Sequence, residues 1–181
     1  MNKKVKLIWT FVLLVVILVG GYVFYSSQQK NMQTGGTQGE IVPAIDFNVQ
    51  NKNGTNTYLS DFNDGKPIVI NFWSSQCGPC VQEMPDFQRL YDDYKDRVHF
   101  VMIDSIGALG ETKESGKAFI EKHQYTFPVF YDVNKNAQQS YGVRSLPTTY
   151  LINKNFEIIR GGSGMINYDL LTGYLDEVLG E

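Results

Sequence analysis

The sequence predicts an α/β sandwich that is built around one mixed β-sheet. Two continuous apolar runs, 67–73 and 98–104, are typical of strands that are buried on both faces. Between them, apolar residues recur every three or four positions, which predicts a helix that packs one face on the sheet. The order strand, helix, strand, followed later by a hairpin and a last helix, is typical of a fold with both parallel and antiparallel strands.

A hairpin and a helical turn precede the first buried run. Two apolar segments, 47–49 and 57–59, flank a polar stretch whose Asn53-Gly54 step marks a hairpin turn. Residues 60–62 then predict a short helical turn.

The rest of the chain supplies the outer layers and the other half of the sheet. The predicted elements are helices at 81–94 and 113–123, a short strand at 128–131, a helical turn at 137–141, and strands at 148–152 and 156–160. Asn167 can cap a last helix, whose apolar residues form one stripe.

An apolar segment precedes the α/β domain. Residues 7–25 carry no charge, and a helix of that length spans roughly 28 Å, close to the hydrocarbon thickness of a bilayer. Lys3, Lys4 and Lys6 favour a cytoplasmic N-terminus with the remainder of the chain outside. We therefore predict a retained single-pass transmembrane anchor at 1–25. A cleaved signal peptide is the competing interpretation, although no small-x-small cleavage site follows the segment.

The remaining chain divides into a linker and one domain. Residues 26–40 are polar and contain glycine without periodicity, so we expect a flexible linker there and a folded domain at 41–181. The chain carries −3 overall, but four lysines and no acid lie in its first thirty residues, so residues 31–181 carry −7. An acidic body argues against nucleic acid as a partner, because phosphate binding needs a basic face.

The sequence contains two cysteines, Cys77 and Cys80, between a predicted strand and a predicted helix. At the N-terminus of a helix the first N–H groups are unpaired, and the positive end of the helix dipole lies there. Both features stabilise a thiolate. We therefore expect Cys77 to have a lowered pKa and to act as the nucleophile. Cys80 lies one turn into the helix and is expected to be the shielded, resolving thiol. Pro79 suits the first turn, where a missing N–H costs nothing.

Three other roles for the pair remain open, and redox exchange is favoured over all of them. A structural disulfide fits an exported domain, but so short a loop constrains the unfolded chain little. A structural zinc site needs four ligands, and only His99 and His123 could join the cysteines. A copper-binding domain normally has a wider cysteine spacing and a placed histidine. No cofactor and no metal is predicted.

Three parts of the sequence together resemble the thioredoxin superfamily. They are NFWSSQCGPC at 71–80, Pro85, and SLPTT at 145–149. The first hairpin and the long segment between Asp104 and Pro128 resemble the exported, TlpA/ResA-like branch. The resemblance covers roughly residues 41–181 and implies a thioredoxin-like three-layer sandwich with a mixed central sheet and an N-terminal β-hairpin extension. A peroxidase of the related peroxiredoxin branch does not fit, because no Thr-x-x-Cys precedes the pair.

The resemblance also implies roles for individual residues. Cys77 and Cys80 would form a redox-active disulfide, with Cys77 attacking and Cys80 resolving. Pro147 would be cis beside the pair, with an ordinary trans proline as the alternative. The backbone of Leu146 would then be free to pair with an extended substrate segment. The implied substrate-binding residues are Leu146, Pro147, Gly78, Pro79 and Gln76.

Glu83, three residues after Cys80, is a third catalytic candidate. In the ResA-like branch a carboxylate at this place takes part in proton handling, and its charge would raise the pKa of a nearby thiol. The alternative is a solvated glutamate that complements the helix dipole. Two departures from relatives bear on the site: Asn71 replaces the buried aspartate of cytoplasmic thioredoxins, and Gln76 replaces a frequent tryptophan. Trp73 is predicted to be a core residue, and His99 and His123 are predicted to be structural or surface groups.

The function expected from these features is an extracytoplasmic thiol–disulfide oxidoreductase that reduces disulfides of exported proteins. The Gly78-Pro79 pair resembles that of thioredoxin, a reductant. Because no nicotinamide or flavin fingerprint is present, electrons would come from a membrane thiol donor. Clients implied by the family include apocytochrome c and methionine sulfoxide reductases, and we expect a monomer. The alternatives are a disulfide-forming oxidase, or a non-enzymatic adaptor or copper carrier.

Overall fold

The structure, a computed structural model, describes residues 42–180. The predicted anchor at 1–25 and the predicted linker at 26–40 lie outside these residues. Within residues 42–180, no helix combines the length and the apolar character that are needed to cross a bilayer.

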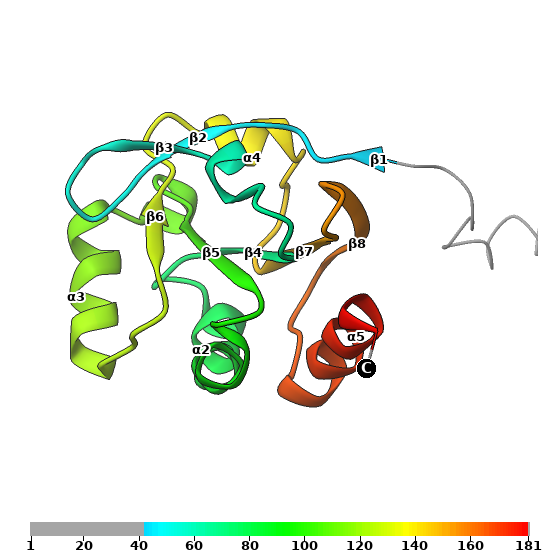
Figure 1. The fold of residues 1–181 in the computed structure, drawn as a ribbon. Helices are drawn as coiled ribbons and strands as arrows, with labels where there is room; N and C mark the ends of the chain where they lie inside the picture. Colours follow the sequence, from blue (N-terminus) through cyan, green and yellow to red (C-terminus); the bar gives the residue numbers. More distant parts are fainter. Residues whose placement is uncertain (1–41, 181) are drawn as a thin grey trace, which may run out of the picture. The chain divides into compact units, whose positions relative to one another are not determined.

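The centre of the described domain is one eight-stranded mixed sheet (Figure 1). Its strands are β1 Val42–Pro43, β2 Asn48–Gln50, β3 Asn56–Tyr58, β4 Ile68–Trp73, β5 His99–Asp104, β6 Val129–Tyr131, β7 Thr148–Ile152 and β8 Glu157–Ser163. They lie in the order β1-β8-β7-β4-β5-β6-β2-β3. The neighbours β4, β5 and β6 run parallel, and all other pairs are antiparallel, so the predicted mixed sheet is confirmed.

The two continuous apolar runs form the middle of the sheet, as predicted. Every residue of β4 is buried, and in β5 only His99 is partly exposed. β4 pairs with β5 along its whole length and with β7 on its other side. Helices or loops cover both faces of these strands, so neither face needs polar residues.

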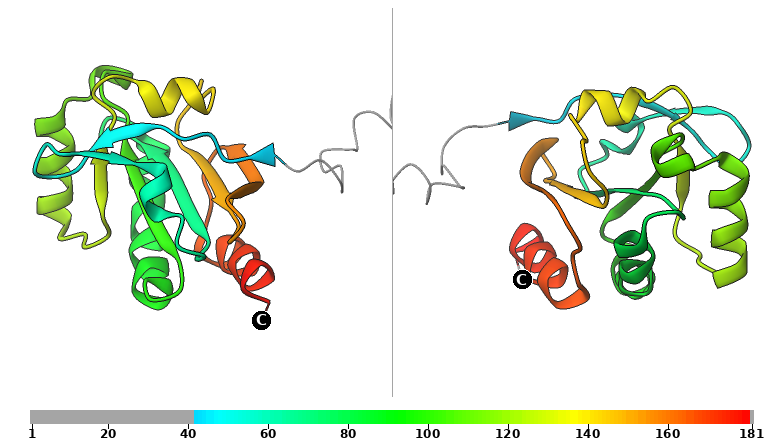
Figure 2. Two further views of the ribbon diagram at one scale, coloured as in Figure 1. Left: turned by 45° about the horizontal axis from the view of Figure 1, so that its top comes forward. Right: turned by 180° about the vertical axis from the view of Figure 1, so that it is seen from behind.

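The helices form the outer layers of the sandwich. They are η1 Leu59–Phe62, α2 Gly78–Tyr94, η2 Ala108–Gly110, α3 Lys113–His123, α4 Asn136–Ser140 and α5 Tyr168–Leu179. α2, α3 and α5 contribute to the hydrophobic cluster on one face of the sheet, and η1 and α4 contribute to the cluster on the other (Figures 1 and 2). The three-layer arrangement is therefore confirmed.

Capping residues determine where two of the helices begin. The Asn167 side chain accepts a hydrogen bond from the Leu170 N–H at 2.9 Å, so α5 starts where the sequence predicts. The Thr112 hydroxyl accepts from the Ser115 N–H at 3.1 Å, and α3 has the predicted bounds.

β8 is longer than predicted, and two short elements were not predicted. The strand continues past 160 to Ser163, although two glycines follow Arg160. Pairing with β7 overrides their low strand propensity, and at Gly161 a Cβ atom would lie 2.5 Å from the Tyr150 ring. The two-residue β1, which pairs with β8, and the three-residue η2 are too short to produce a sequence period.

The β2–β3 hairpin closes through one asparagine side chain. The Asn51 Oδ1 accepts hydrogen bonds from the N–H groups of Asn53 and Thr55, and the Asn51 N–H donates to the Thr55 carbonyl. Gly54 has a φ of +80°, which favours glycine. β2 therefore ends at Gln50, immediately before the turn.

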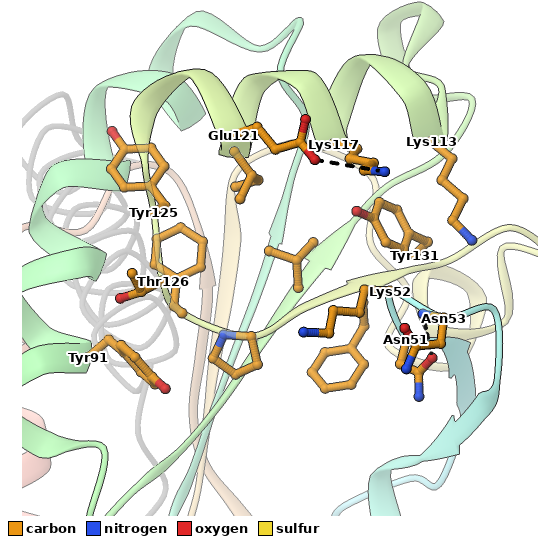
Figure 3. A pocket seen from close by; sticks show the side chains of 15 residues that line it. Asn51, Lys52, Asn53, Tyr91, Lys113, Lys117, Glu121, Tyr125, Thr126 and Tyr131 are labelled. Atoms are coloured by element: carbon orange, nitrogen blue, oxygen red, sulfur yellow. Dashed lines mark hydrogen bonds and ion pairs between the residues drawn. The ribbon is translucent and has the colours of Figure 1, made fainter.

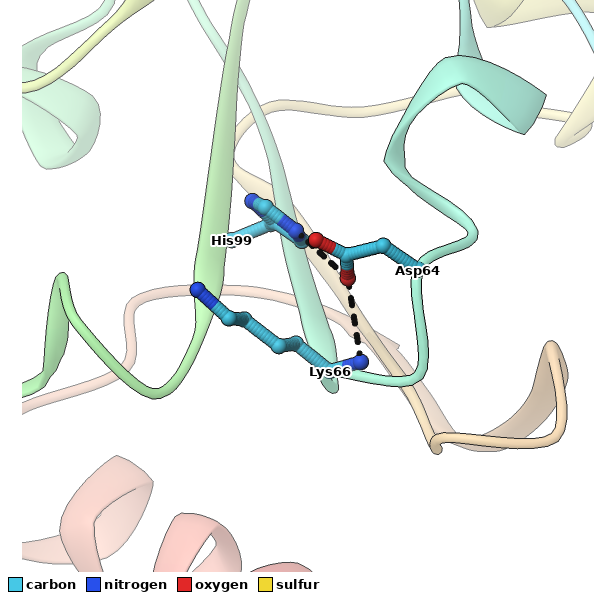
Figure 4. Close-up of polar contacts among 3 residues, drawn as sticks. All are labelled: Asp64, Lys66 and His99. Carbon is cyan, nitrogen blue, oxygen red and sulfur yellow. Dashed lines mark hydrogen bonds and ion pairs between the residues drawn. The ribbon is translucent and has the colours of Figure 1, made fainter.

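The two histidines have structural contacts, as predicted. His99 begins β5, and its Nε2 lies 2.9 Å from the Asp64 Oδ1, which also accepts from the Lys66 backbone (Figure 4). The bond with His99 is the main reason why the pKa of Asp64 is lowered. His123 ends α3 and packs against the rings of Phe119 and Tyr125.

Two glycine substitutions in helices should change stability in opposite directions. In α3, a Cβ on Gly116 would collide with the buried Asp104 carboxylate, so Gly116→Ala should destabilise the domain by about 2 kcal/mol. In α5, Gly173 is exposed and has no atom near the Cβ position, so Gly173→Ala should stabilise by about 0.5–1 kcal/mol. Urea unfolding measures the free energy of unfolding of both variants. A change of the same sign and size in the two would contradict the packing described for Gly116.

Candidate active site

The cysteine pair lies at the junction of β4 and α2. Cys77 is the N-cap of α2, and its Sγ accepts a hydrogen bond from the Cys80 N–H at 3.3 Å. A disulfide joins Cys77 to Cys80, with the two Cα atoms 5.2 Å apart. Pro79 lies in the first turn, as predicted, and that turn holds no acidic residue. The free N–H groups and the dipole of α2 therefore act on the Cys77 sulfur without an opposing carboxylate in the same turn.

Both cysteine residues are buried in this disulfide form, whereas three residues next to them are exposed. Cys80 is fully buried and Cys77 is 3% exposed, whereas Gln76, Gly78 and Pro79 are all exposed. The surface that a partner first meets is therefore formed by these three neighbours. Only the edge of the Cys77 residue reaches that surface.

The Leu146–Pro147 peptide bond is cis, as the resemblance implied. Pro147 is buried, and its carbonyl accepts a hydrogen bond from the Gly164 N–H at 2.8 Å, at the end of β8. Leu146 packs against the hydrophobic cluster that contains both cysteines. Within residues 42–180 the Leu146 backbone makes no hydrogen bond, so its N–H and carbonyl are free for an added strand.

Glu83 is buried inside the domain rather than solvated. It is 1% exposed, with Asn71 Nδ2 donating to one carboxyl oxygen at 2.8 Å and the Ile166 N–H donating to the other at 3.0 Å. Burial raises the pKa of Glu83 to about 7, although the two hydrogen bonds oppose the shift. The solvated alternative is therefore wrong, and the carboxyl group can gain or lose a proton near neutral pH.

Asn71 connects Glu83 to the sheet. Its Nδ2 also donates to the Thr149 Oγ1 at 3.1 Å, so one amide group bridges α2 and β7. Its Oδ1 is buried and has no hydrogen-bond partner within the described residues. The sequence identified this position as a lost proton acceptor, and the structure adds that Asn71 holds the carboxyl group that remains.

Glu111 is a functional candidate that the sequence analysis missed. Its carboxylate accepts hydrogen bonds from the Ser74 hydroxyl at 2.6 Å and the Ser75 hydroxyl at 2.8 Å, and also from Ser115. The Gln76 N–H adds a longer bond of 3.3 Å. Glu111 thus holds all three residues between β4 and Cys77. No sequence spacing links a residue of one loop to another loop, so only the fold could reveal this contact.

Hydrogen bonding decides the protonation state of Glu111. Burial alone would raise its pKa, but the bonds from Ser115, Ser74 and Ser75 outweigh that cost, so the pKa is lowered. Asp104 lies nearby and is fully buried, with no partner for either oxygen within residues 42–180. Burial, assisted by the charge of Glu111, raises the pKa of Asp104 to about 8. At neutral pH Glu111 is therefore ionised and Asp104 is mostly neutral.

Trp73 and Pro85, which the sequence also singled out, have structural positions. Trp73 is fully buried and its ring packs at a tilt against that of Phe119, so its core role is confirmed. Pro85 lies inside α2, where it cannot donate to the Val81 carbonyl. Within the part of the chain that the structure describes, no group of three or more potential metal ligands exists.

Comparisons with known proteins agree with this geometry. Residues 41–160 match the AhpC/TSA family. A thiol-disulfide oxidoreductase ResA from Geobacillus kaustophilus is 32% identical over 182 residues, which cover 98% of this chain and 99% of the relative. The chain belongs to this thioredoxin-like family. It is a thiol–disulfide oxidoreductase, and its ResA-like relatives imply proteins with disulfides as its substrates.

Other ResA-like relatives and solved structures give the same result. ResA from Halalkalibacterium halodurans is 29% identical over 97% of both chains. The crystal structure of StoA from Bacillus subtilis is 27% identical, has a TM-score of 0.63, and covers 74% of this chain and 97% of its own. The pneumococcal exposed lipoprotein thioredoxin from Streptococcus pneumoniae is 28% identical, has a TM-score of 0.65, and covers 74% of this chain and 99% of its own. The predicted thioredoxin-like fold is confirmed.

Glu83 should make the oxidised domain lose stability as the pH rises. Its pKa in the folded state, about 7, lies above the ordinary 4.5, so the folded state binds the proton more tightly than the unfolded state. The stabilisation is complete below pH 4.5 and is lost as the pH rises through about 7. Glu83→Gln should remove most of this loss, leaving a slope at higher pH from Asp104. Urea unfolding at a series of pH values measures it, and an unchanged profile would refute the assignment.

Glu111→Gln should loosen the segment that carries Cys77. The substitution removes the charge from at least three hydrogen bonds, and bonds to charged groups contribute about 1.5–3 kcal/mol each in mutational series. We expect faster hydrogen exchange at the Gln76 amide and a loss of about 2 kcal/mol in stability. Glu114→Gln, at an exposed position in the first turn of α3, is the matched control. It should leave the Gln76 exchange rate unchanged and should lower stability by less than about 1 kcal/mol. Equal exchange rates in both variants would show that Glu111 does not hold the segment.

Proposed function

We propose that this ResA-like oxidoreductase reduces disulfides of exported proteins from the outer side of the cytoplasmic membrane. The observation that carries the proposal is the position of Cys77, which caps α2 in a disulfide with Cys80 and shares a cluster with Leu146 of the cis-proline loop. The cysteine pair exchanges disulfide bonds, and Leu146 offers its free backbone N–H and carbonyl to an extended client segment.

In the proposed reaction, electrons pass to the client through a mixed disulfide. The Cys77 thiolate attacks one client sulfur, the client disulfide breaks, and the other client sulfur leaves as a thiolate. Cys80, after losing its proton, attacks the Cys77 sulfur and releases the second client thiolate. The client gains two electrons and two protons in total, and the Cys77–Cys80 disulfide forms again. A dithiol donor in the membrane must then reduce that disulfide.

Glu83 is proposed as the acceptor of the Cys80 proton. It lies one helical turn from Cys80, it is buried, and its pKa of about 7 suits proton exchange at neutral pH. Asn71 and the Ile166 N–H orient its carboxyl group. As a buried anion it also opposes the ionisation of the neighbouring thiols.

The reducing direction is supported by the residues between the cysteines. Gly78 and Pro79 resemble those of thioredoxin, whose potential is about −270 mV, whereas strong oxidants stabilise their dithiol form. A disulfide-forming oxidase would use the same steps in reverse. The potential of the pair, measured against glutathione or dithiothreitol, separates the two directions.

The proposed location and partners are supported by the apolar segment and by the relatives. The uncharged segment 7–25, with Lys3, Lys4 and Lys6 before it, supports a single-pass anchor with the domain outside. The similarity to a pneumococcal exposed lipoprotein thioredoxin supports the same side. Apocytochrome c and methionine sulfoxide reductases are the proposed clients, and a membrane thiol protein is the proposed donor.

Cys80→Ser should trap the client. Without the resolving thiol, the mixed disulfide on Cys77 cannot be released, so a covalent adduct should accumulate in the membrane fraction under oxidising conditions. Cys77→Ser should form no adduct and should lose insulin reduction by several orders of magnitude. Mass spectrometry of the adduct identifies the client. Partner binding that is retained in Cys77→Ser, without insulin reduction by the unmodified protein, would favour the adaptor alternative. Stoichiometric Cu(I) binding with little disulfide exchange would favour the copper carrier.

Glu83→Gln tests the proposed proton acceptor separately. Removal of the buried carboxylate should lower the pKa of the Cys77 thiol and slow the resolving step. The rate of alkylation of the reduced protein by iodoacetamide, measured over a range of pH, gives the pKa of the Cys77 thiol, with Glu114→Gln as the control. An unchanged titration and an unchanged resolving rate would exclude Glu83 from the reaction.

A further inference from the structure

A pocket of about 660 Å³ lies along β6, and it contains none of the residues of the active site. Its walls come from the β2–β3 hairpin, α3, the segment before β6 and one residue of α2 (Figure 3). A volume of this size is typical of ligand sites.

The pocket contains an unpaired length of sheet edge. β2 pairs with β6 at one position, where Gln50 lies opposite Tyr131. The Pro128 carbonyl accepts from the Met102 N–H on β5, and backbone groups alternate between the two edges of a strand. The N–H and carbonyl of Val129 therefore point away from β5, toward the pocket, where the register gives them no partner in β2.

The hairpin turn is the reason why this edge stays open. In a longer β2, residue 52 would lie opposite Val129. The Asn51 turn instead redirects the chain immediately after Gln50, as described above. The hairpin thus leaves a gap at the edge of β6 that another strand can fill.

The charge around this edge is positive, although the domain is acidic. Lys113 and Lys117 lie along α3 and Lys52 lies on the hairpin, and in Figure 3 β6 crosses between them. Glu121 is the one acidic residue among those that line the pocket, and its Oε1 forms an ion pair with the Lys117 Nζ at 3.8 Å. Lys113 lies over the Tyr131 ring and near Gln50, whereas Lys52 has no hydrogen bond or ion pair within the described residues. An incoming anion therefore meets net positive charge.

The floor of the pocket is held by packing and by hydrogen bonds. Phe127, Phe130 and Tyr131 are buried. The segment before β6 is held to α2, because Gln88 accepts from the Thr126 N–H at 2.7 Å and donates to its hydroxyl at 2.8 Å. Strand addition here requires little rearrangement of the domain, which favours binding.

We infer that an extended polypeptide segment with acidic side chains binds along the open edge of β6. Its backbone would pair with Val129, and since side chains alternate along a strand, every second residue would face Lys113 and Lys117. A second copy of this chain does not fit, because its own edge would bring the same lysines into contact. The inference concerns a surface separate from the cysteines and does not depend on the direction of the redox reaction.

The test uses the full chain in neutral detergent and a fluorescein-labelled peptide of alternating glutamate and valine. We expect saturable binding by fluorescence anisotropy that weakens as salt is added. Lys52→Glu and Lys117→Glu should each weaken it about tenfold, because attraction is replaced by repulsion. Lys154→Glu, the same charge change at an exposed turn between β7 and β8, should leave it unchanged. Hydrogen exchange followed by NMR should show protection of the Val129 amide in the complex.

Three results would overturn the inference. The first is absence of saturable binding. The second is equally tight binding of a peptide of alternating lysine and valine, or equal affinity of the three lysine variants for the glutamate and valine peptide. The third is displacement of the peptide by inorganic phosphate with no protection of Val129, which would indicate a simple anion site. Insulin reduction, measured in parallel, reports the redox activity independently, so either proposal can fail while the other stands.

Discussion

The position of one helix N-terminus, held at the end of a buried strand, determines the chemistry of this domain. β4 is bonded on both sides, so the point at which Cys77 begins α2 is fixed by the sheet rather than by the loop. The parallel neighbour β5 ends beside Trp73, and the antiparallel neighbour β7 begins beside Phe72. The segments that contain Glu111 and Pro147 therefore reach the same end of the sheet as the cysteines.

Two glutamates near the cysteines show how surroundings decide the charge of one residue type. Glu83 has two hydrogen-bond donors, and burial raises its pKa to about 7. Glu111 is also buried, but it has three hydroxyl donors and a backbone N–H, and its pKa is lowered. One carboxyl group is thus suited to exchange a proton, and the other is suited to hold a loop as a permanent anion.

The sequence predicted the elements with strong periods and the residues with local signals. The buried strands, the long helices and the Asn167 cap are patterns within one segment, and Cys77 and Cys80 depend on a short motif at a strand–helix boundary. The cis geometry of Pro147 came from family resemblance. Glu111, the bridge made by Asn71, and the open edge of β6 depend on contacts between distant segments, which no single-segment pattern contains. The predicted strand ends at Arg160, whereas β8 continues through Gly161 and Gly162, because pairing with β7 overrides the low strand propensity of glycine.

A short length of backbone after β8 has a mechanical consequence. The Gly164 N–H donates a hydrogen bond to the Pro147 carbonyl. Two residues later, the Ile166 N–H donates a hydrogen bond to the Glu83 carboxyl group. The cis-proline turn and the ionisable group inside α2 are thus attached to adjacent points of one tether. A displacement of the cis-proline turn relative to Glu83 therefore requires a change in one of these hydrogen bonds or in the backbone of residues 164–166.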